Sequence, residues 1–240
     1  MKKHISAILL SYLLCFYADA QDYRFVSINY LAEQEIGRIV LPQIYKNIGL
    51  EISITPLPGK RAQNEAAKGS NFHGEIMRIF TYGNENPNTI RVPTPYYYLE
   101  TMAFVKVDST LDIREAKDLK NMRIAKVRGV KHTNNITAGL SNVYDSNTTE
   151  KILKQVATGF VDVALTNTID GKLILNEHGI KNVKPTNMPL ATLALYHYIH
   201  KDNAHLVDKI DDEIKRLKKN GQLAQMIKEA ESTILSGIDD

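Results

Sequence analysis

Glu75 and Arg78 stand three positions apart, and together they could recognise a small charged molecule. A glutamate can hold an ammonium group, and the planar guanidinium of an arginine can hold a carboxylate through two parallel hydrogen bonds. The same two residues could instead form a structural salt bridge that contacts no ligand. The residue types leave both interpretations open.

A glycine turn and a run of tyrosines supply further candidates. Arg128 and Lys131 flank Gly129 and could form an anion-binding nest, although a solvated loop explains these charges equally well. In an extended strand, Tyr96 and Tyr98 would share one face. That face could stack on a solute or enclose a cation, or it could pack in the protein core.

The sequence contains no motif for nucleophilic catalysis or metal binding. The histidines lack the spacing of a zinc site, and His197 and His200 would face opposite sides of a predicted strand. Phosphate-cradling glycine motifs and the Ser-x-x-Lys and Gly-x-Ser-x-Gly arrangements are also absent. We therefore expect no cofactor and no metal.

The composition is that of a globular protein and argues against a nucleic-acid partner. Of 240 residues, 43% are hydrophobic and 24% are charged, with a formal net charge of +3. The basic residues are scattered and form no long run. The length suits one or two domains with a core that needs no disulfides.

Residues 1–20 have the features of a cleavable signal peptide. Lys2 and Lys3 precede a mostly apolar run over 5–17, and small residues end the segment at Ala20. The run is shorter than the roughly 20 residues of a membrane-spanning helix, and a buried N-terminal helix is the alternative. The mature chain would begin at Gln21 and contain no cysteine. We expect it in the periplasm of a Gram-negative bacterium, outside the membrane.

The elements that must position these candidates alternate between strands and helices. Hydrophobic periodicity predicts strands over 23–29, 51–55, 89–93, 100–107, 122–127, 161–165 and 193–199, with a further short strand that ends near Gly74 and Glu75. It predicts helices over 34–45, 61–68, 113–119, 148–158, 168–177, from 203 to Gly221, and over 222–230. Strands joined by helices favour a mainly parallel sheet.

Two of the predicted strands divide the mature chain into two lobes. One strand enters the second α/β unit near residue 103, and another leaves it near residue 195. The first lobe would therefore comprise 21–103 and 196–240, with the second lobe, 104–195, inserted between them. Two lobes on two strands imply a hinge and closure on a ligand.

Several short motifs follow one another in a distinctive order. They include Arg-Val-Pro-Thr-Pro-Tyr at 91–96, Ala-Phe-Val at 103–105, Met-Arg-Ile-Ala at 122–125, Gly-Phe-Val-Asp-Val-Ala-Leu at 159–165 and Lys-Asn-Gly at 219–221. In this order the chain resembles the extracellular solute-binding proteins of family 3. These are type II periplasmic binding proteins that include the amino-acid-binding proteins of ABC transporters. The resemblance covers nearly the whole mature chain.

The resemblance implies an α/β fold of two lobes, with a discontinuous first lobe, an inserted second lobe and a two-strand hinge. It also implies a small polar or charged solute in the cleft between the lobes, bound at strand ends and helix N-termini. The candidate ligand-binding residues are Tyr30, Arg61, Glu75, Arg78, Tyr96 and Tyr98 in the first lobe, and Arg128, Lys131, Thr133 and Asn167 in the second.

The sequence departs from the amino-acid binders at three places. The stretch 84–88 lacks the arginine that would hold a ligand carboxylate, and Asn167 stands where an acidic residue would hold the α-amino group. Val130 replaces an expected hydroxyl residue. The resemblance therefore implies an amino-acid-like solute other than a standard α-amino acid.

These observations together predict a monomeric solute-binding protein without enzymatic activity that delivers its solute to an ABC permease. A sensor or partner-binding module of the same fold is the alternative. A cyclohexadienyl dehydratase-like enzyme, with Glu75 as the general acid, is a further one.

Overall fold

The computed structural model describes residues 23–236, so the predicted signal peptide at 1–20 lies outside the described residues. The first lobe contains β1 (Tyr23–Ile28), α1 (Ala32–Asn47), β2 (Ile52–Leu57), α2 (Gly59–Lys68), β3 (Gly74–Ile79), α3 (Tyr82–Glu85), β4 (Thr89–Arg91), η2 (Lys201–Leu206), α7 (Val207–Lys219) and α8 (Gln222–Ser236). The second lobe contains η1 (Ala116–Leu119), β6 (Ile124–Val127), α4 (Lys131–Ile136), β7 (Val143–Ser146), α5 (Thr149–Thr158), β8 (Val163–Asn167), α6 (Thr168–Glu177) and β9 (Val183–Pro185). Strands β5 (Tyr97–Lys106) and β10 (Ala191–His200) pass between the two lobes.

One sheet runs through both lobes in the order β2-β1-β3-β10-β5-β8-β6-β7. Strands β1, β2 and β3 pair in parallel in the first lobe, as β6, β7 and β8 do in the second. Strands β5 and β10 are antiparallel to each other and to their other neighbours. The parallel parts follow from the alternation of strand and helix along the chain.

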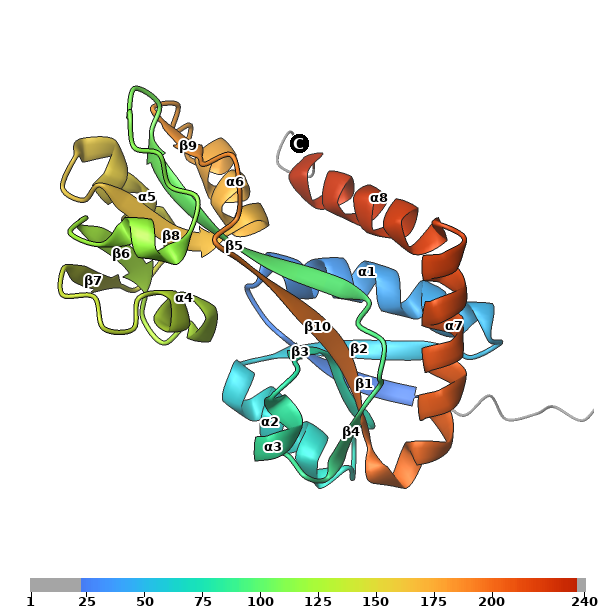
Figure 1. The fold of residues 1–240 in the computed structure, drawn as a ribbon. Helices are drawn as coiled ribbons and strands as arrows, with labels where there is room; N and C mark the ends of the chain where they lie inside the picture. The colour runs from blue at the N-terminus through green and yellow to red at the C-terminus, as the bar shows by residue number, and fades with distance from the viewer. Residues whose placement is uncertain (1–22, 237–240) are drawn as a thin grey trace, which may run out of the picture.

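Strand β5 changes its pairing partner at the hinge. From Tyr97 to Thr101 it pairs with β10, and from Thr101 to Phe104 it pairs with β8. Thr101 itself lies opposite both Ala191 and Asn167. Figure 1 shows β5 and β10 as the strands that join the lobes. The predicted two-strand hinge is confirmed, whereas the lobe boundaries at 21–103, 104–195 and 196–240 remain our proposal.

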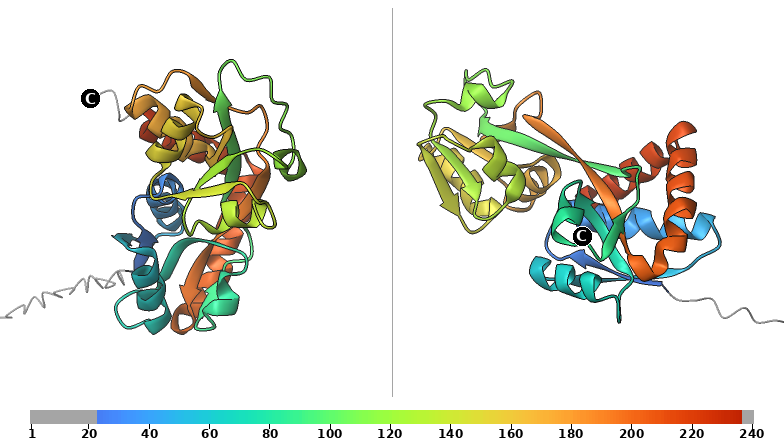
Figure 2. Two further views of the ribbon diagram at one scale, coloured as in Figure 1. Left: turned by 90° about the vertical axis from the view of Figure 1, so that its left-hand side faces the viewer. Right: turned by 60° about the horizontal axis from the view of Figure 1, so that its bottom comes forward.

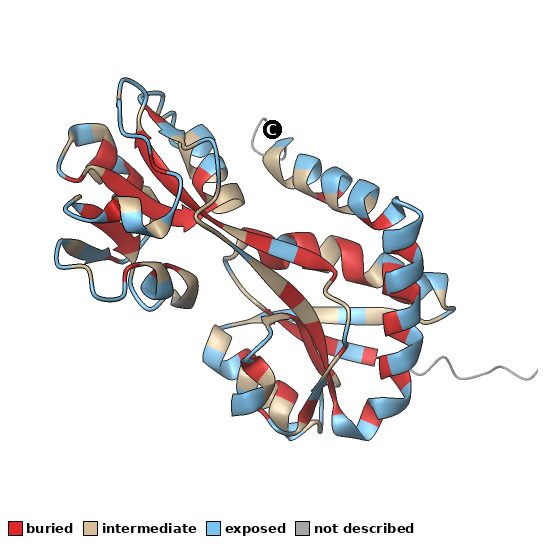
Figure 3. Ribbon diagram, in the orientation of Figure 1, coloured by how far each residue is buried: buried red, intermediate tan, exposed pale blue. Residues whose placement is uncertain are grey.

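Each lobe has its own hydrophobic core. In the first lobe, α1, α7 and α8 cover one face of the sheet, and α2 covers the other (Figures 1 and 2). Ile36, Val40 and Ile44 on α1 follow one another at four-residue spacing, and all three are fully buried. Full burial of one such side chain stabilises the fold by about 1.5–3 kcal/mol. The strands at the centre of both lobes are correspondingly buried along most of their length (Figure 3).

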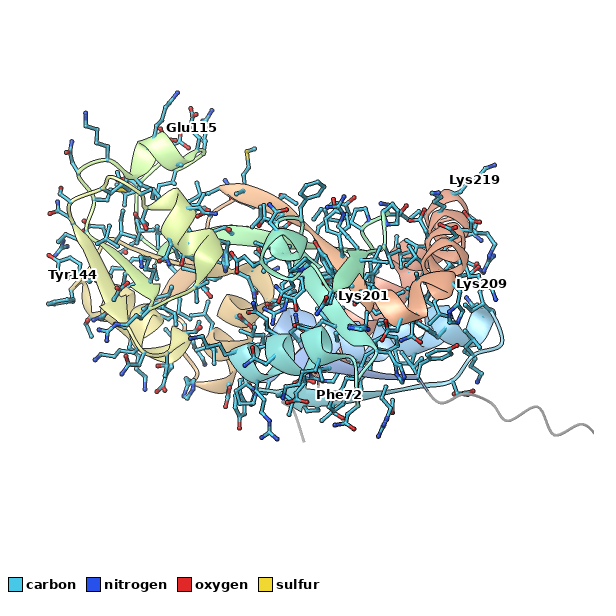
Figure 4. The ribbon with its side chains drawn as sticks, turned by 90° about the horizontal axis from the view of Figure 1, so that it is seen from below. Phe72, Glu115, Tyr144, Lys201, Lys209 and Lys219 are labelled. Atoms are coloured by element: carbon cyan, nitrogen blue, oxygen red, sulfur yellow. The ribbon has the colours of Figure 1, made fainter. Side chains whose placement is uncertain are left out.

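The molecule is elongated along the line that joins its two lobes. Tyr144 in the second lobe and Lys219 in the first lie near its opposite ends (Figure 4). In the part of the chain that the structure describes, no helix combines the length and the apolar character needed to cross a membrane.

The predicted strand end near Gly74 is wrong, because β3 begins there and continues to Ile79. Gly74 has a φ of +147°, and a Cβ at this position would lie 2.0 Å from the carbonyl oxygen of Tyr198. The glycine therefore marks a close approach of two strands rather than a break.

Strand β2 also differs from the prediction, because it continues through Pro56 to Leu57. This strand lies at the edge of the sheet and pairs only with β1 among the described strands, so a residue without an N–H is tolerated there. Helix α4 and strand β7 had no counterpart in the predicted pattern, because both are short and mostly polar.

Candidate functional site

Polar side chains of the two lobes meet beside the hinge. Asn167 ends β8, and its Nδ2 donates to Oε2 of Glu33 on α1 at 2.9 Å and to Oδ2 of Asp170 at 2.7 Å. The Oδ1 atom of Asp170 accepts the backbone N–H of Ala32 at 3.0 Å. We call Ala32, Glu33, Asn167 and Asp170 the interlobe cluster. It joins the first turn of α1 in the first lobe to the first turn of α6 in the second.

Both carboxyl groups of the interlobe cluster hold their protons more tightly than usual. Burial raises the pKa of Glu33 above its ordinary value of 4.5, and the charge of Asp170 raises it further. Burial also raises the pKa of Asp170 above 3.8, against the opposite effect of its bonds from Ala32 and Asn167. The low polarity of the site and the proximity of two acids thus favour the protonated forms.

A pocket of about 190 Å³ lies beside the interlobe cluster, and we call it the hinge pocket. Its lining comes from α1, β5, β8, α6 and α8 and comprises Glu33, Tyr97, Tyr98, Leu99, Glu100, Asn167, Thr168, Ile169, Lys172 and Glu231. The pocket is smaller than the roughly 300–1,000 Å³ of most ligand sites, so it suits a small solute. Three glutamates and one lysine give its wall an excess of acidic groups.

Two hydrogen bonds organise the wall of the hinge pocket. Thr168 at the start of α6 donates from Oγ1 to Oε2 of Glu100 at 2.7 Å, which links the second lobe to β5. The hydroxyl of Tyr97 donates to Oε1 of Glu231 on α8 at 3.0 Å. The pocket therefore connects the hinge strand to elements of both lobes.

The Glu75–Arg78 pair lies in the first lobe and is linked to further groups. Nε of Arg78 donates to the Glu75 carboxylate, and Nη2 donates to Oε1 of Glu75 and to the Gly59 carbonyl, each at 3.1 Å. The hydroxyl of Tyr82 donates to the same carboxylate, and its ring lies 4.8 Å from the guanidinium. Burial raises the pKa of Glu75, although Arg78 opposes that rise. A solute would have to displace these bonds to bind here.

The predicted common face of Tyr96 and Tyr98 is wrong. Tyr96 precedes β5, so strand alternation does not extend to it. It is buried in the core, and its hydroxyl donates to the carbonyl of Ile76 at 2.8 Å. Tyr98 is 45% exposed, and its hydroxyl accepts from Nζ of Lys218 at 3.1 Å. Only Tyr98 of these two lines the hinge pocket.

The remaining candidates lie on separate elements. Tyr30 follows β1 with its side chain 92% exposed, and Arg61 is exposed on the first turn of α2. In the second lobe, Arg128 is exposed, Lys131 opens α4, and buried Thr133 donates from Oγ1 to the carbonyl of Val130. Of the ten candidates, the structure places Asn167 and Tyr98 at the hinge pocket.

Sequence reasoning missed Glu33 and Asp170. The predicted helix began at residue 34, which left Glu33 in a loop. Glu33 and its partner Asn167 are 134 positions apart along the chain, and Asp170 and its partner Ala32 are 138 positions apart. One local signal was present, because an asparagine followed three residues later by an acidic residue often marks a helix N-terminus.

The most deeply buried histidine of the described residues serves a structural contact. His197 is fully buried, bonds to the Tyr45 hydroxyl and to the Glu75 carbonyl, and has its pKa lowered to about 4 by burial. Within residues 23–236, no three His, Cys, Asp or Glu side chains lie close enough together to hold a metal ion.

Comparison with known proteins reveals distant relatives and a clear likeness of fold. No family model matches the sequence. An uncharacterized protein of Shewanella oneidensis is 22% identical over 204 residues, which cover 82% of this chain and 76% of that protein.

Solved structures match over most of the chain. An ancestral cationic amino acid solute-binding protein superposes with a TM-score of 0.67 at 15% identity, over 87% of this chain and 94% of the other. A histidine kinase sensor domain similar to periplasmic binding proteins gives a TM-score of 0.60 at 15% identity, over 86% and 94%. At such identities the likeness concerns the fold. The chain therefore has the two-lobed type II periplasmic binding protein fold that its sequence motifs implied.

Proposed function

We propose that this protein binds a small polar or charged solute between its two lobes. The observation that carries the proposal is the mixed lining of the hinge pocket, to which α1 and α8 of one lobe and α6 of the other contribute. A solute that contacts both lobes stabilises the arrangement in which both contacts form. Binding would thereby be coupled to the relative position of the lobes.

The solute we propose is amino-acid-like and carries a positive charge, but it is not a standard α-amino acid. Even with Glu33 protonated, Glu100 and Glu231 outnumber Lys172 in the pocket wall, which favours a cation. The neutral Asn167 and the stretch 84–88 without arginine argue against the usual clamp for both ends of an α-amino acid. The fold likeness to a cationic amino acid binder is compatible with this class.

The role we propose is that of a monomeric periplasmic protein that delivers its solute to an ABC permease. The predicted signal peptide supports the location. A sensory role is the second candidate, because a histidine kinase sensor domain shares the fold. A dehydratase-like reaction would use Glu75 as its acid. The carboxylate of Glu75 already accepts hydrogen bonds from Arg78 and Tyr82, which supports binding without turnover.

A thermal-shift screen of the chain from Gln21 tests the proposal. The panel comprises amino acids, amines, carboxylates and cyclic acids, each supplied in large excess. A ligand at 100 times its dissociation constant stabilises the folded state by about 2.7 kcal/mol, which is readily measured. We expect one cationic class to raise the melting temperature and calorimetry to give one site per chain.

Two variants of α8 test whether a ligand found in the screen binds in the hinge pocket. Glu231→Gln removes a carboxylate from the pocket wall and should weaken binding about tenfold or more, as expected for a lost charged hydrogen bond. Glu229→Gln changes an exposed glutamate of the same helix and should leave affinity unchanged. The proposed site would be contradicted if no compound of the panel changed the melting temperature, or if both variants bound the ligand with equal affinity.

A further inference from the structure

Helix α1 is capped from the opposite lobe. Its N-cap residue, Leu31, offers no side-chain acceptor to the free N–H groups of the first turn. The carboxylate of Asp170 on α6 supplies one, because its Oδ1 accepts the N–H of Ala32 at 3.0 Å. A negative charge at this end also interacts favourably with the helix dipole. A helix of the first lobe thus depends on a side chain of the second.

The interlobe cluster also places a second acid beside this cap. Nδ2 of Asn167 carries two hydrogens and donates to both Glu33 and Asp170, while its Oδ1 accepts the N–H of Asp170 and caps α6. One neutral amide therefore serves two carboxyl groups. When both acids are ionised, the site holds two negative charges with little solvent and repulsion between them.

We propose that the interlobe cluster is a proton-operated latch, which holds the lobes together when one of its two carboxyl groups is protonated and releases them when both are ionised. The latch concerns the lobes themselves and does not depend on the identity of the solute.

The direction of the pH response follows from linkage. Each carboxyl binds its proton more tightly in the latched arrangement than in water, where its pKa would be near 4.5 or 3.8. The stabilising contribution is therefore complete below those ordinary values and is lost as pH rises through the raised ones. Acid should favour the latched arrangement, and alkali the released one.

Other ionisable groups line the hinge pocket beside the cluster, and their titration must be distinguished from that of Glu33 and Asp170. They are Tyr97, Tyr98 and Glu100 on β5, Lys172 on α6 and Glu231 on α8. Burial raises the pKa of Tyr97, which keeps it protonated. His132 on α4 bonds to Thr101 at the hinge, and burial lowers its pKa to about 4, so it is neutral above acid pH.

Distance measurements between spin labels test the latch without any added solute. Residues 21–240 contain no cysteine, so Lys120→Cys in the second lobe and Lys219→Cys in the first give two unique labelling sites on exposed residues. We expect one narrow distance distribution at about pH 5, where the raised pKa values keep the cluster protonated, and a shifted or broader one at about pH 8.5, where both carboxyl groups ionise.

Two substitutions within one turn of α1 identify the carboxyl group that causes the pH response. Glu33→Gln retains an acceptor for Asn167 but cannot ionise, so its distribution should match the acid form of the wild type at both pH values. Glu35→Gln removes a carboxylate that pairs with Arg38 outside the cluster, and it should retain the full response.

Asp170→Asn provides an independent test if Glu33→Gln folds poorly. It keeps an acceptor for Ala32 and removes the other titrating group, so the pH response should disappear as well. The latch is refuted if the wild-type distribution is the same at both pH values, or if Glu33→Gln and Asp170→Asn respond as the wild type does. Because no solute is present, this failure is separate from failure of the thermal-shift screen.

Discussion

At the scale of single residues, Gly171 on α6 makes contact between a helix and the hinge strand possible. A Cβ at this position would lie 2.0 Å from the ring of Phe104 on β5. We predict that Gly171→Ala destabilises the protein by about 1–3 kcal/mol, because the added methyl overpacks a buried site. Urea denaturation monitored by circular dichroism measures the change.

The matched control is another glycine in a helix with room for a methyl group. At Gly59 the nearest atom to an added Cβ is 3.7 Å away, on Ile28. Gly59→Ala should therefore leave stability within about 0.5 kcal/mol of the wild type or increase it slightly. Equal losses in the two variants would show that the Phe104 contact is not the cause.

Asn167 illustrates what the sequence could and could not predict about a single residue. Its position after a predicted strand made it a candidate for the site. Its contact with Glu33, 134 positions away, has no local signature in the sequence, whereas Asp170 follows it at the spacing of a helix N-terminus. The reverse happened at Tyr96, whose aromatic type suggested a ligand contact while its hydroxyl bonds within the core. Residue type alone cannot distinguish a ligand contact from a contact within the core, because the difference depends on whether the side chain is buried in the folded protein.

At the scale of elements, the cap that α6 provides to α1 has a measurable consequence. We predict that Asp170→Ala speeds amide exchange at the start of α1, since Ala32 loses its acceptor. Loss of a helix cap costs about 1 kcal/mol, which corresponds to roughly fivefold faster exchange. Hydrogen–deuterium exchange with mass spectrometry of a peptide that spans residues 29–36 reports this change.

Thr148→Ala is the control for a cap within one lobe. Thr148 caps α5 by accepting the N–H of Lys151 at 3.2 Å, entirely inside the second lobe. This variant should lose a similar amount of stability and leave exchange at α1 unchanged. If exchange at α1 is equally slow in Asp170→Ala and in the wild type, the cap across the lobes does not operate in solution.

The elements themselves were largely predictable, and the misses have physical causes. Helices α1, α5 and α7 carry apolar residues at helical spacing, so periodicity located them within a few residues. The predicted end of a strand at Gly74 was wrong because this glycine allows two strands to approach each other closely. Helix α4 and strand β7 are too short and polar to show a hydrophobic periodicity. The sequence predicted a mainly parallel sheet but not the order of its strands.

At the scale of the whole molecule, two kinds of contact hold α6 of the second lobe against the first: the hydrogen bonds at the hinge and the packing of Ile169 against the first-lobe core. Strands β5 and β10 join the lobes continuously, and each lobe has a core of its own, so a rotation about these strands would leave most of each core in place. The interlobe cluster lies where such rotation is resisted. A single change there should therefore alter the shape of the protein and leave both lobes folded.

We predict that Asn167→Asp separates the lobes at neutral pH. Aspartate is a good N-cap, so α6 keeps its start, but the variant loses both amide donors and adds a third carboxylate beside Glu33 and Asp170. Small-angle X-ray scattering should show a larger radius of gyration than for the wild type, with an unchanged circular dichroism spectrum. Asn187→Asp adds the same charge at an exposed position and should keep the wild-type radius. A wild-type radius in Asn167→Asp would mean that other contacts, such as Thr168 with Glu100, fix the position of the lobes.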